Sequence, residues 1–142
     1  MIWKQVVNIK ALNNYASSSM INHLGIEFTE FGDDYLSARM PVDYRTKQPH
    51  GILHGGASVT LAETVGSVGS TLVIGDSKTQ TVVGVEINAN HLISVTDGYV
   101  YAAATPIRLG RTLHVWNIEI KNEAGKLVCV SRLTIAIVQR KN

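Results

Sequence analysis

The run of residues 57–74 constrains the fold of this chain more than any other feature. It consists almost entirely of Ala, Val, Leu, Ser, Thr and Gly, and it is long enough for about five helical turns. Several small residues in the run have a low helix propensity. We expect close packing of the helix against surrounding backbone to offset this cost. The small residues that would allow this packing are Ala57, Ala62, Gly66, Gly69 and Ser70. The run therefore predicts one long, buried helix.

Strand patterns lie on both sides of this helix. Apolar and polar residues alternate at 26–29 and at 36–42 around a Gly-Asp-Asp turn, which predicts a hairpin. After the helix, β-branched and apolar segments predict strands at 81–92, 98–108, 111–121 and 127–138. Short turns separate these strands, so we expect successive antiparallel neighbours. A short helix is expected at 8–18, and an ordered loop at 44–54.

This order of elements predicts an α+β fold in which an antiparallel sheet curls round one long helix. The length of 142 residues fits a single domain, 1–142, with no room for a second core. Such a sheet has edge strands that need cover or a partner. Charged residues make up only 17% of the chain, which also favours self-association, so we expect a homo-oligomer.

Composition also limits the partners and the compartment. A net charge of +2 gives no footprint for nucleic acid. Cys129 is the one thiol, which excludes an internal disulfide framework and a cysteine zinc cluster and fits a reducing cytosol. No segment resembles a signal peptide or a membrane span. We expect a cytoplasmic protein with no membrane partner and no cofactor.

Glu63 is the one formally charged side chain between positions 49 and 76. Burial of a carboxylate costs on the order of several kcal/mol unless the group is paired, hydrogen-bonded or protonated. It could lie on an exposed stripe, or pair with a buried arginine such as Arg39 or Arg132. The residues around it show no polar stripe, which favours a functional role for this acid.

The predicted helix begins at His54-Gly55-Gly56. The two glycines leave backbone N–H groups unobstructed at the positive end of the helix dipole. Such a terminus stabilises a carbonyl oxygen that becomes negative as it is attacked. His50 and His54 are four residues apart, but Pro49 and the glycines place them at a turn, so we expect no metal site. A GxSxG elbow is absent from the sequence, which disfavours a serine hydrolase.

Longer motifs resemble a known family. MPVDYRTKQPHGILHGGASVTLAETVGSVGS, then VVGVEINANHL, VWNIEI and SRLTIAI, closely resemble the bacterial hotdog-fold acyl-CoA thioesterases. The similar group includes 1,4-dihydroxy-2-naphthoyl-CoA hydrolase of menaquinone biosynthesis and its proofreading relative in enterobactin biosynthesis. The resemblance implies a long helix wrapped by an antiparallel sheet, two subunits joined edge to edge, and dimers that commonly pair into tetramers.

The resemblance also implies site residues. It places the catalytic carboxylate at Glu63, as nucleophile or as general base for water, and the thioester-polarising amide at Gly55. Gln48 and His54 would position the thioester, and Ser67 would hold the attacking water. Ser67 lies one helical turn after Glu63, so both side chains can address one water. In such dimers the carboxylate faces the His-Gly-Gly turn of the other subunit, which implies active sites at the subunit interface.

The resemblance also implies substrate-binding residues, but some of these positions differ from the family pattern. Thr64, beside the acyl pocket with Val68, stands where relatives often have Ser. Ile93 stands where they often have Arg, so that contact with the CoA phosphates does not carry over. Arg108 and Arg111 flank a turn and are either an alternative source of charge or ordinary surface arginines. His91 either contacts pantetheine or caps a hydrogen-bond network. The set Thr64, Val68, His91, Arg108 and Arg111 is the predicted substrate-binding group.

The leading hypothesis is therefore hydrolysis of an acyl-CoA with an aromatic or compact acyl group, with 1,4-dihydroxy-2-naphthoyl-CoA as one candidate. One alternative is a hotdog dehydratase or hydratase that acts on a CoA thioester. Such relatives usually pair a catalytic His with an acid on another motif. The other alternative is a non-catalytic acyl-CoA sensing module, a class that tends to carry a DNA-binding extension.

Overall fold

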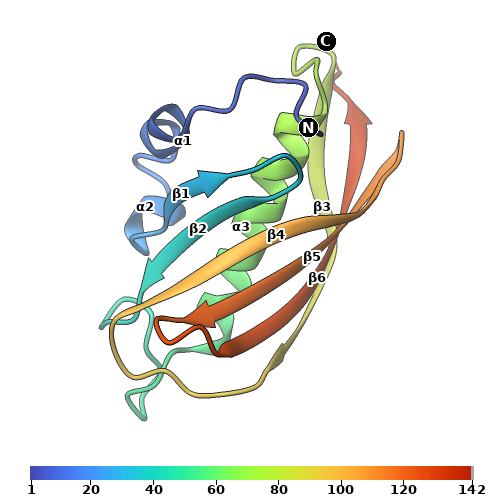
Figure 1. The fold of residues 1–142 in the computed structure, drawn as a ribbon. Coiled ribbons are helices and arrows are strands. Elements are labelled where there is room, and N and C mark those ends of the chain that lie inside the picture. Colours follow the sequence, from blue (N-terminus) through green and yellow to red (C-terminus); the bar gives the residue numbers. More distant parts are fainter. Residues whose placement is uncertain (142) are drawn as a thin grey trace.

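A long helix crosses the concave face of an antiparallel sheet in the computed structural model, which describes residues 1–141 (Figure 1). Two short helices precede the sheet, and one strand pair precedes the long helix. The elements are α1 (Ile9–Tyr15), α2 (Met20–His23), β1 (Glu27–Phe31), β2 (Leu36–Pro41), α3 (Gly55–Val73), β3 (Gln80–His91), β4 (Tyr99–Leu109), β5 (Leu113–Asn122) and β6 (Leu127–Gln139). The α+β fold, the hairpin and the single long helix are as the sequence predicts.

The six strands are arranged in the order β1-β2-β4-β5-β6-β3. β4, β5 and β6 are successive antiparallel neighbours, as expected. The same expectation is wrong for β3, which pairs with β6 from Gln80↔Gln139 to His91↔Cys129. β2 and β5 already occupy both sides of β4, so the chain crosses from β3 at one edge to β4 within the sheet. β3 is therefore an edge strand.

Small residues on α3 bring the helix close to the sheet. A Cβ atom on Gly66 would lie 2.6 Å from Cδ2 of Leu133, and one on Gly69 would lie 3.0 Å from the ring of Trp116. Both partners are fully buried. This confirms the expected close packing at Gly66 and Gly69, because a larger residue at either position would push α3 off the sheet.

The N-terminal segment covers one end of this core. The indole of Trp3 stacks on that of Trp116 with ring centroids 6.4 Å apart, and the backbone N–H groups of Lys4 and Gln5 donate to the carbonyl of Leu72. α1 lies within the short helix expected at 8–18, and Asn8 caps it with a side chain that accepts from the Ala11 N–H. α2 is not predicted, since four residues are too few for a helical pattern.

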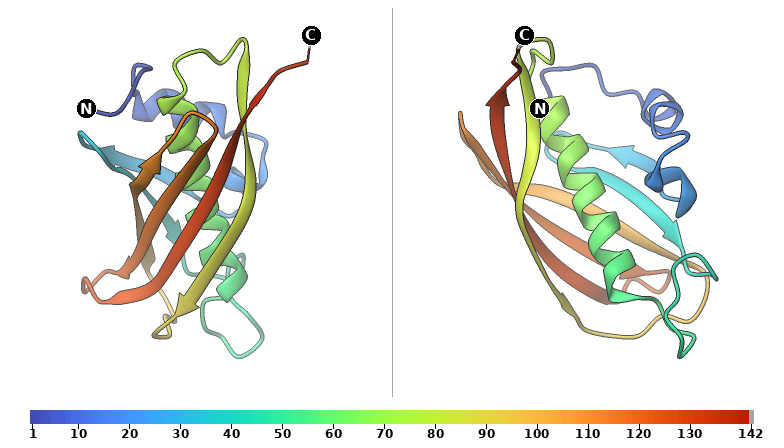
Figure 2. Two further views of the ribbon diagram at one scale, coloured as in Figure 1. Left: turned by 90° about the vertical axis from the view of Figure 1, so that its right-hand side faces the viewer. Right: turned by 180° about the vertical axis from the view of Figure 1, so that it is seen from behind.

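Strand β3 leaves one hydrogen-bonding side without a neighbour in residues 1–141 (Figure 2). Val83 and Val85 on this strand are 45% and 61% exposed. An edge strand with exposed apolar side chains is a template for pairing with another chain.

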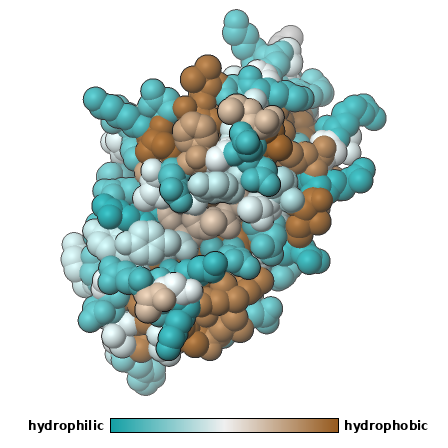
Figure 3. Space-filling view, viewed as in Figure 1, coloured by the Kyte–Doolittle hydropathy of each residue, from teal (hydrophilic) through white to brown (hydrophobic). Residues whose placement is uncertain are grey.

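The sheet face turned away from α3 mixes hydrophilic side chains with separate hydrophobic patches (Figure 3). Among residues 1–141, the helices are all too short or too polar to cross a membrane.

The contact between α3 and Trp116 can be tested with Gly69→Val. The added carbons must displace a rigid, buried indole, so we expect the free energy of unfolding to fall by about 1–3 kcal/mol. Thr60→Val on the half-buried side of α3 is the control and should change it by less than about 0.5 kcal/mol. Denaturant unfolding at one protein concentration measures both. Equal stability of Gly69→Val and the parent would contradict the close packing.

Candidate active site

An ordered loop leads into α3 and holds the first residues of the site. Thr46 is buried and donates through Oγ1 to the Pro41 carbonyl over 2.7 Å. Lys47 and Leu53 form an isolated antiparallel bridge, and Gly51 takes a left-handed φ of +82° at the tip between them. Gln48 therefore sits on a fixed, narrow loop. Its side-chain oxygen accepts from the His50 N–H.

Hydrogen bonds also fix the start of this loop. The Arg45 guanidinium donates to the Asp43 carboxylate, with Nη2 and Oδ2 2.7 Å apart. These bonds lower the pKa of Asp43 below its usual value. The ion pair therefore stabilises the turn from which the Gln48 loop departs.

The start of α3 presents one unused backbone amide. His54 caps the helix, and its Nδ1 accepts from the Gly56 N–H over 2.8 Å. This corrects the expectation that both glycine amides are unobstructed, because the imidazole of His54 satisfies the second one. The Gly55 N–H donates to no group among residues 1–141. Gly55 thus provides the available donor at the positive end of the helix dipole.

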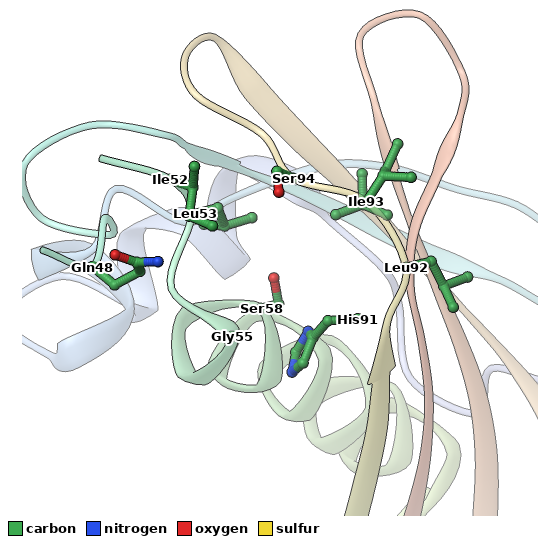
Figure 4. Close-up of a pocket in the computed structure, with 10 residues that line it drawn as sticks. Gln48, Ile52, Leu53, Gly55, Ser58, His91, Leu92, Ile93 and Ser94 are labelled. Atoms are coloured by element: carbon green, nitrogen blue, oxygen red, sulfur yellow. The ribbon is translucent and has the colours of Figure 1, made fainter. Parts of the chain in front are cut away.

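A cavity of about 300 Å³ opens beside this amide (Figure 4). It lies between the Gln48 loop, the first turn of α3 and the end of β3, with Val128 from β6. Its lining residues are Gln48, Ile52, Leu53, Gly55, Ser58, His91, Leu92, Ile93, Ser94 and Val128. Ser58, which is not among the predicted site residues, is 1% exposed and points toward the cavity. Its position three residues after Gly55, on the same helix face, is a signal that could have found it.

His91 lies directly against Gly55. A Cβ atom on Gly55 would be 2.7 Å from His91 Nε2, so a glycine is required for the ring to reach this position. Figure 4 shows the imidazole beside the first turn of α3. The ring also lines the cavity, where a ligand can reach it.

Glu63 lies elsewhere on α3 and does not line this cavity. It follows Gly55 by eight residues, which is about 12 Å along a helix axis. The carboxylate is half-buried and faces the edge strand, where a Cβ on Gly84 would come within 2.6 Å of Glu63 Oε1. The alternative of a pair with Arg39 is not realised, because Arg39 binds Glu27 at 2.9 Å.

The side of α3 that carries Glu63 is more polar than expected. A half-buried stripe of hydroxyl residues flanks Glu63, which corrects the statement that no polar stripe surrounds it. Thr60, Thr64 and Thr71 donate to the helix carbonyls four residues earlier, which lets hydroxyl residues occupy a half-buried face. The stripe consists of Thr60, Glu63, Thr64, Ser67 and Thr71, and Val68 lies beside it against the core.

The two predicted arginines are not at the Gly55 cavity. Arg108 is exposed near the end of β4, and Arg111 lines a separate cavity at the C-terminal end of α3. One chain therefore brings together Gln48, Gly55 and His91, and it holds His54 beside them. Glu63 and Ser67 lie further along α3, and the arginines lie at its opposite end.

The helix wrapped by an antiparallel sheet, with a free amide at its start, defines a hotdog-fold protein whose site is suited to polarising a carbonyl oxygen. The chain belongs to the thioesterase superfamily, whose family model matches residues 50–129. It is a thioester hydrolase.

Relatives and a solved structure agree with this family. The chain is 51% identical to 1,4-dihydroxy-2-naphthoyl-CoA hydrolase of Escherichia coli K12, over 97% of this chain and 100% of that protein. It is 48% identical to the proofreading thioesterase EntH of Cronobacter turicensis, over 97% and 99%. The crystal structure of thioesterase HI1161 from Haemophilus influenzae is 52% identical, with a TM-score of 0.95 over 98% of this chain and 96% of that one.

The contact between Gly84 and Glu63 generates a prediction. Gly84 has no left-handed φ, so alanine fits its backbone and the added methyl group meets only the Glu63 carboxylate. We expect Gly84→Ala to displace that carboxylate and to lower kcat for thioester hydrolysis by about tenfold or more, with a smaller change in KM. Steady-state kinetics measure both constants.

Asn88→Ala, an exposed change on the same strand, is the matched control and should leave kcat within about twofold of the parent. An unaltered kcat in a folded Gly84→Ala protein would show that turnover does not depend on the position of the Glu63 carboxylate.

Proposed function

We propose that the protein hydrolyses the thioester of an acyl-CoA with an aromatic or compact acyl group, and that 1,4-dihydroxy-2-naphthoyl-CoA is a candidate substrate. The observation that carries the proposal is the free Gly55 amide at the Gln48 and His91 cavity. The names of the relatives in Escherichia coli and Cronobacter support the substrate class. Thr64 and Val68 are proposed to border the acyl group, and Arg108 and Arg111 remain predicted contacts of the CoA phosphates.

Thioester hydrolysis needs a donor for the carbonyl oxygen and an activated nucleophile, and the proposed residues can supply both. The Gly55 N–H donates to the thioester oxygen as that oxygen gains negative charge, and the stabilisation is greatest in the transition state. Gln48 and His54 orient the thioester. The carbonyl carbon is attacked either by the Glu63 carboxylate or by a water that loses its proton to Glu63 and is held by Ser67. The C–S bond then breaks, and CoA leaves as a thiolate that takes up a proton. Where Glu63 is the nucleophile, water then hydrolyses the mixed anhydride between Glu63 and the acyl group, which releases the acid and restores the carboxylate.

The separation within one chain supports a site shared between subunits. Glu63 does not line the cavity that holds Gly55, so a second copy must supply the carboxylate if both act on one thioester. The unpaired edge of β3, which lies against Glu63 through Gly84, offers a place for that copy. We propose a homodimer, or a dimer of dimers, with active sites at the interface.

Thiol release from a panel of aromatic, short-chain and long-chain acyl-CoA substrates tests the activity. We expect the best substrate to be aromatic or compact, and Glu63→Gln to reduce its turnover by about two orders of magnitude or more with the fold intact. Near-parental turnover by Glu63→Gln and Glu63→Ala would refute the role of the acid. Binding of acyl-CoA without hydrolysis of any member would favour a sensing module.

A mixing experiment tests the shared site. Gly55→Pro removes the oxyanion donor, and Gly55→Ala, which keeps the N–H but also displaces His91, is its control. We expect Gly55→Pro to be at least about a hundredfold slower than Gly55→Ala. When Gly55→Pro and Glu63→Gln chains are co-expressed, half of the dimers contain one copy of each, and each mixed dimer has one complete site.

Activity should therefore recover to about a quarter of the parental value. Circular dichroism must show that each variant is folded, and sedimentation must show an even-numbered oligomer. No recovery in mixed dimers, or full activity in a parental monomer, would rule out a site shared between subunits.

A further inference from the structure

A second cavity, of about 440 Å³, lies at the C-terminal end of α3, remote from Gly55. The N-terminal segment, the turn between β4 and β5, and residues of β3 and β6 close it. Its lining residues are Ile2, Lys4, Val73, Ile74, Gln80, Leu109, Gly110, Arg111, His114 and Ile137. Of this lining, the thioesterase reaction proposed above uses only Arg111, as a predicted contact of the CoA phosphates, and it gives the cavity itself no role.

The formal charges of the lining are all positive. Lys4 and Arg111 both face this space, and no lining residue is a carboxylate. The three ion pairs found within residues 1–141 involve neither side chain. Two cations beside one cavity without an acidic partner favour an anionic occupant.

A buried polar group completes the lining. His114 is 3% exposed, and its Nδ1 lies 2.9 Å from Ser70 Oγ, which also accepts from the Trp116 indole over 2.8 Å. Burial lowers the pKa of His114, and the charge of Lys4 lowers it further. The lowered pKa favours the neutral imidazole, which the hydrogen bond to Ser70 fixes in place as a polar group of the lining.

The remainder of the lining is largely apolar, with Ile2, Val73, Ile74, Leu109 and Ile137. A small inorganic anion would leave this surface unfilled, whereas a ligand with an apolar body would cover it. We propose that the cavity binds an organic acid, a carboxylate carried on a compact apolar body, with the carboxylate paired to Lys4 and Arg111. The free acid released by the proposed hydrolysis belongs to this class, but binding here requires no turnover.

The protein contains its own reporter of this site. Its two tryptophans are Trp3, next to two lining residues, and Trp116, which shares Ser70 with His114. We therefore titrate the intact protein with benzoate and follow tryptophan fluorescence. Benzyl alcohol serves as the neutral counterpart, acetate as the anion without an apolar ring, and adenosine 3′,5′-bisphosphate as the nucleotide end of CoA.

We expect saturable binding of benzoate that is at least about tenfold tighter than that of benzyl alcohol or acetate. Lys4→Gln and Arg111→Gln should each weaken it about fivefold or more, as expected when a charge-assisted contact is lost. Lys10→Gln and Arg132→Gln, at exposed positions outside the cavity, are charge-matched controls. Each should bind benzoate with an affinity within about twofold of that of the parent.

Three results would overturn the proposal. Equal binding of benzoate and benzyl alcohol would remove the role of the charge, and unaltered affinity in both cavity variants would place the ligand elsewhere. Preferential binding of the nucleotide that depends on Arg111 would assign this end of α3 to the CoA phosphates instead. Because the assay needs no turnover, its failure is distinct from failure of the proposed hydrolysis.

Discussion

The close contact between α3 and the sheet is the interaction on which the other features depend. Gly66 and Gly69 allow the helix to lie directly on Leu133 and Trp116. Since packed side chains transmit displacement, this contact fixes where both ends of α3 fall. The N-terminal end presents the Gly55 amide to one cavity, and the C-terminal end borders the other. A shift of the helix would therefore alter both cavities together.

Local patterns predicted most of the elements but not all of their pairing. The length of α3, the first hairpin and the last three strands follow from periodicity and turn residues, which are properties of neighbouring positions. The pairing of β3 with β6 is a property of the whole sheet. It depends on which strands have already occupied the two sides of β4, and no short window of sequence records that.

The site shows the same division. Gln48, Gly55 and His91 were predicted and lie at one cavity. The glycine pair at the helix start indicated Gly55 directly, whereas Gln48 and His91 came from the resemblance to the thioesterase family. The capture of the Gly56 amide by His54 was not predicted, since it depends on the extended backbone of the cap and on the ring orientation. Glu63 was found by its isolation in the sequence, and its spacing of eight residues already separates it from Gly55 on α3, but its position against Gly84 required the structure. The predicted roles of these residues await the experiments above.

The stacking of Trp3 on Trp116 has a practical consequence for handling the protein. Ile2 donates to the Asp33 carbonyl, and Lys4 and Gln5 donate to Leu72, so the chain is anchored within a few residues of its first. A purification tag fused ahead of Met1 would emerge beside this anchor, where its bulk and charge act on the wall formed by Ile2 and Lys4. A tag attached after β6 would emerge at the same end of the molecule, where Gln80 and Ile137 form another part of this lining, so protein from which the tag has been removed is the better choice for biophysical work.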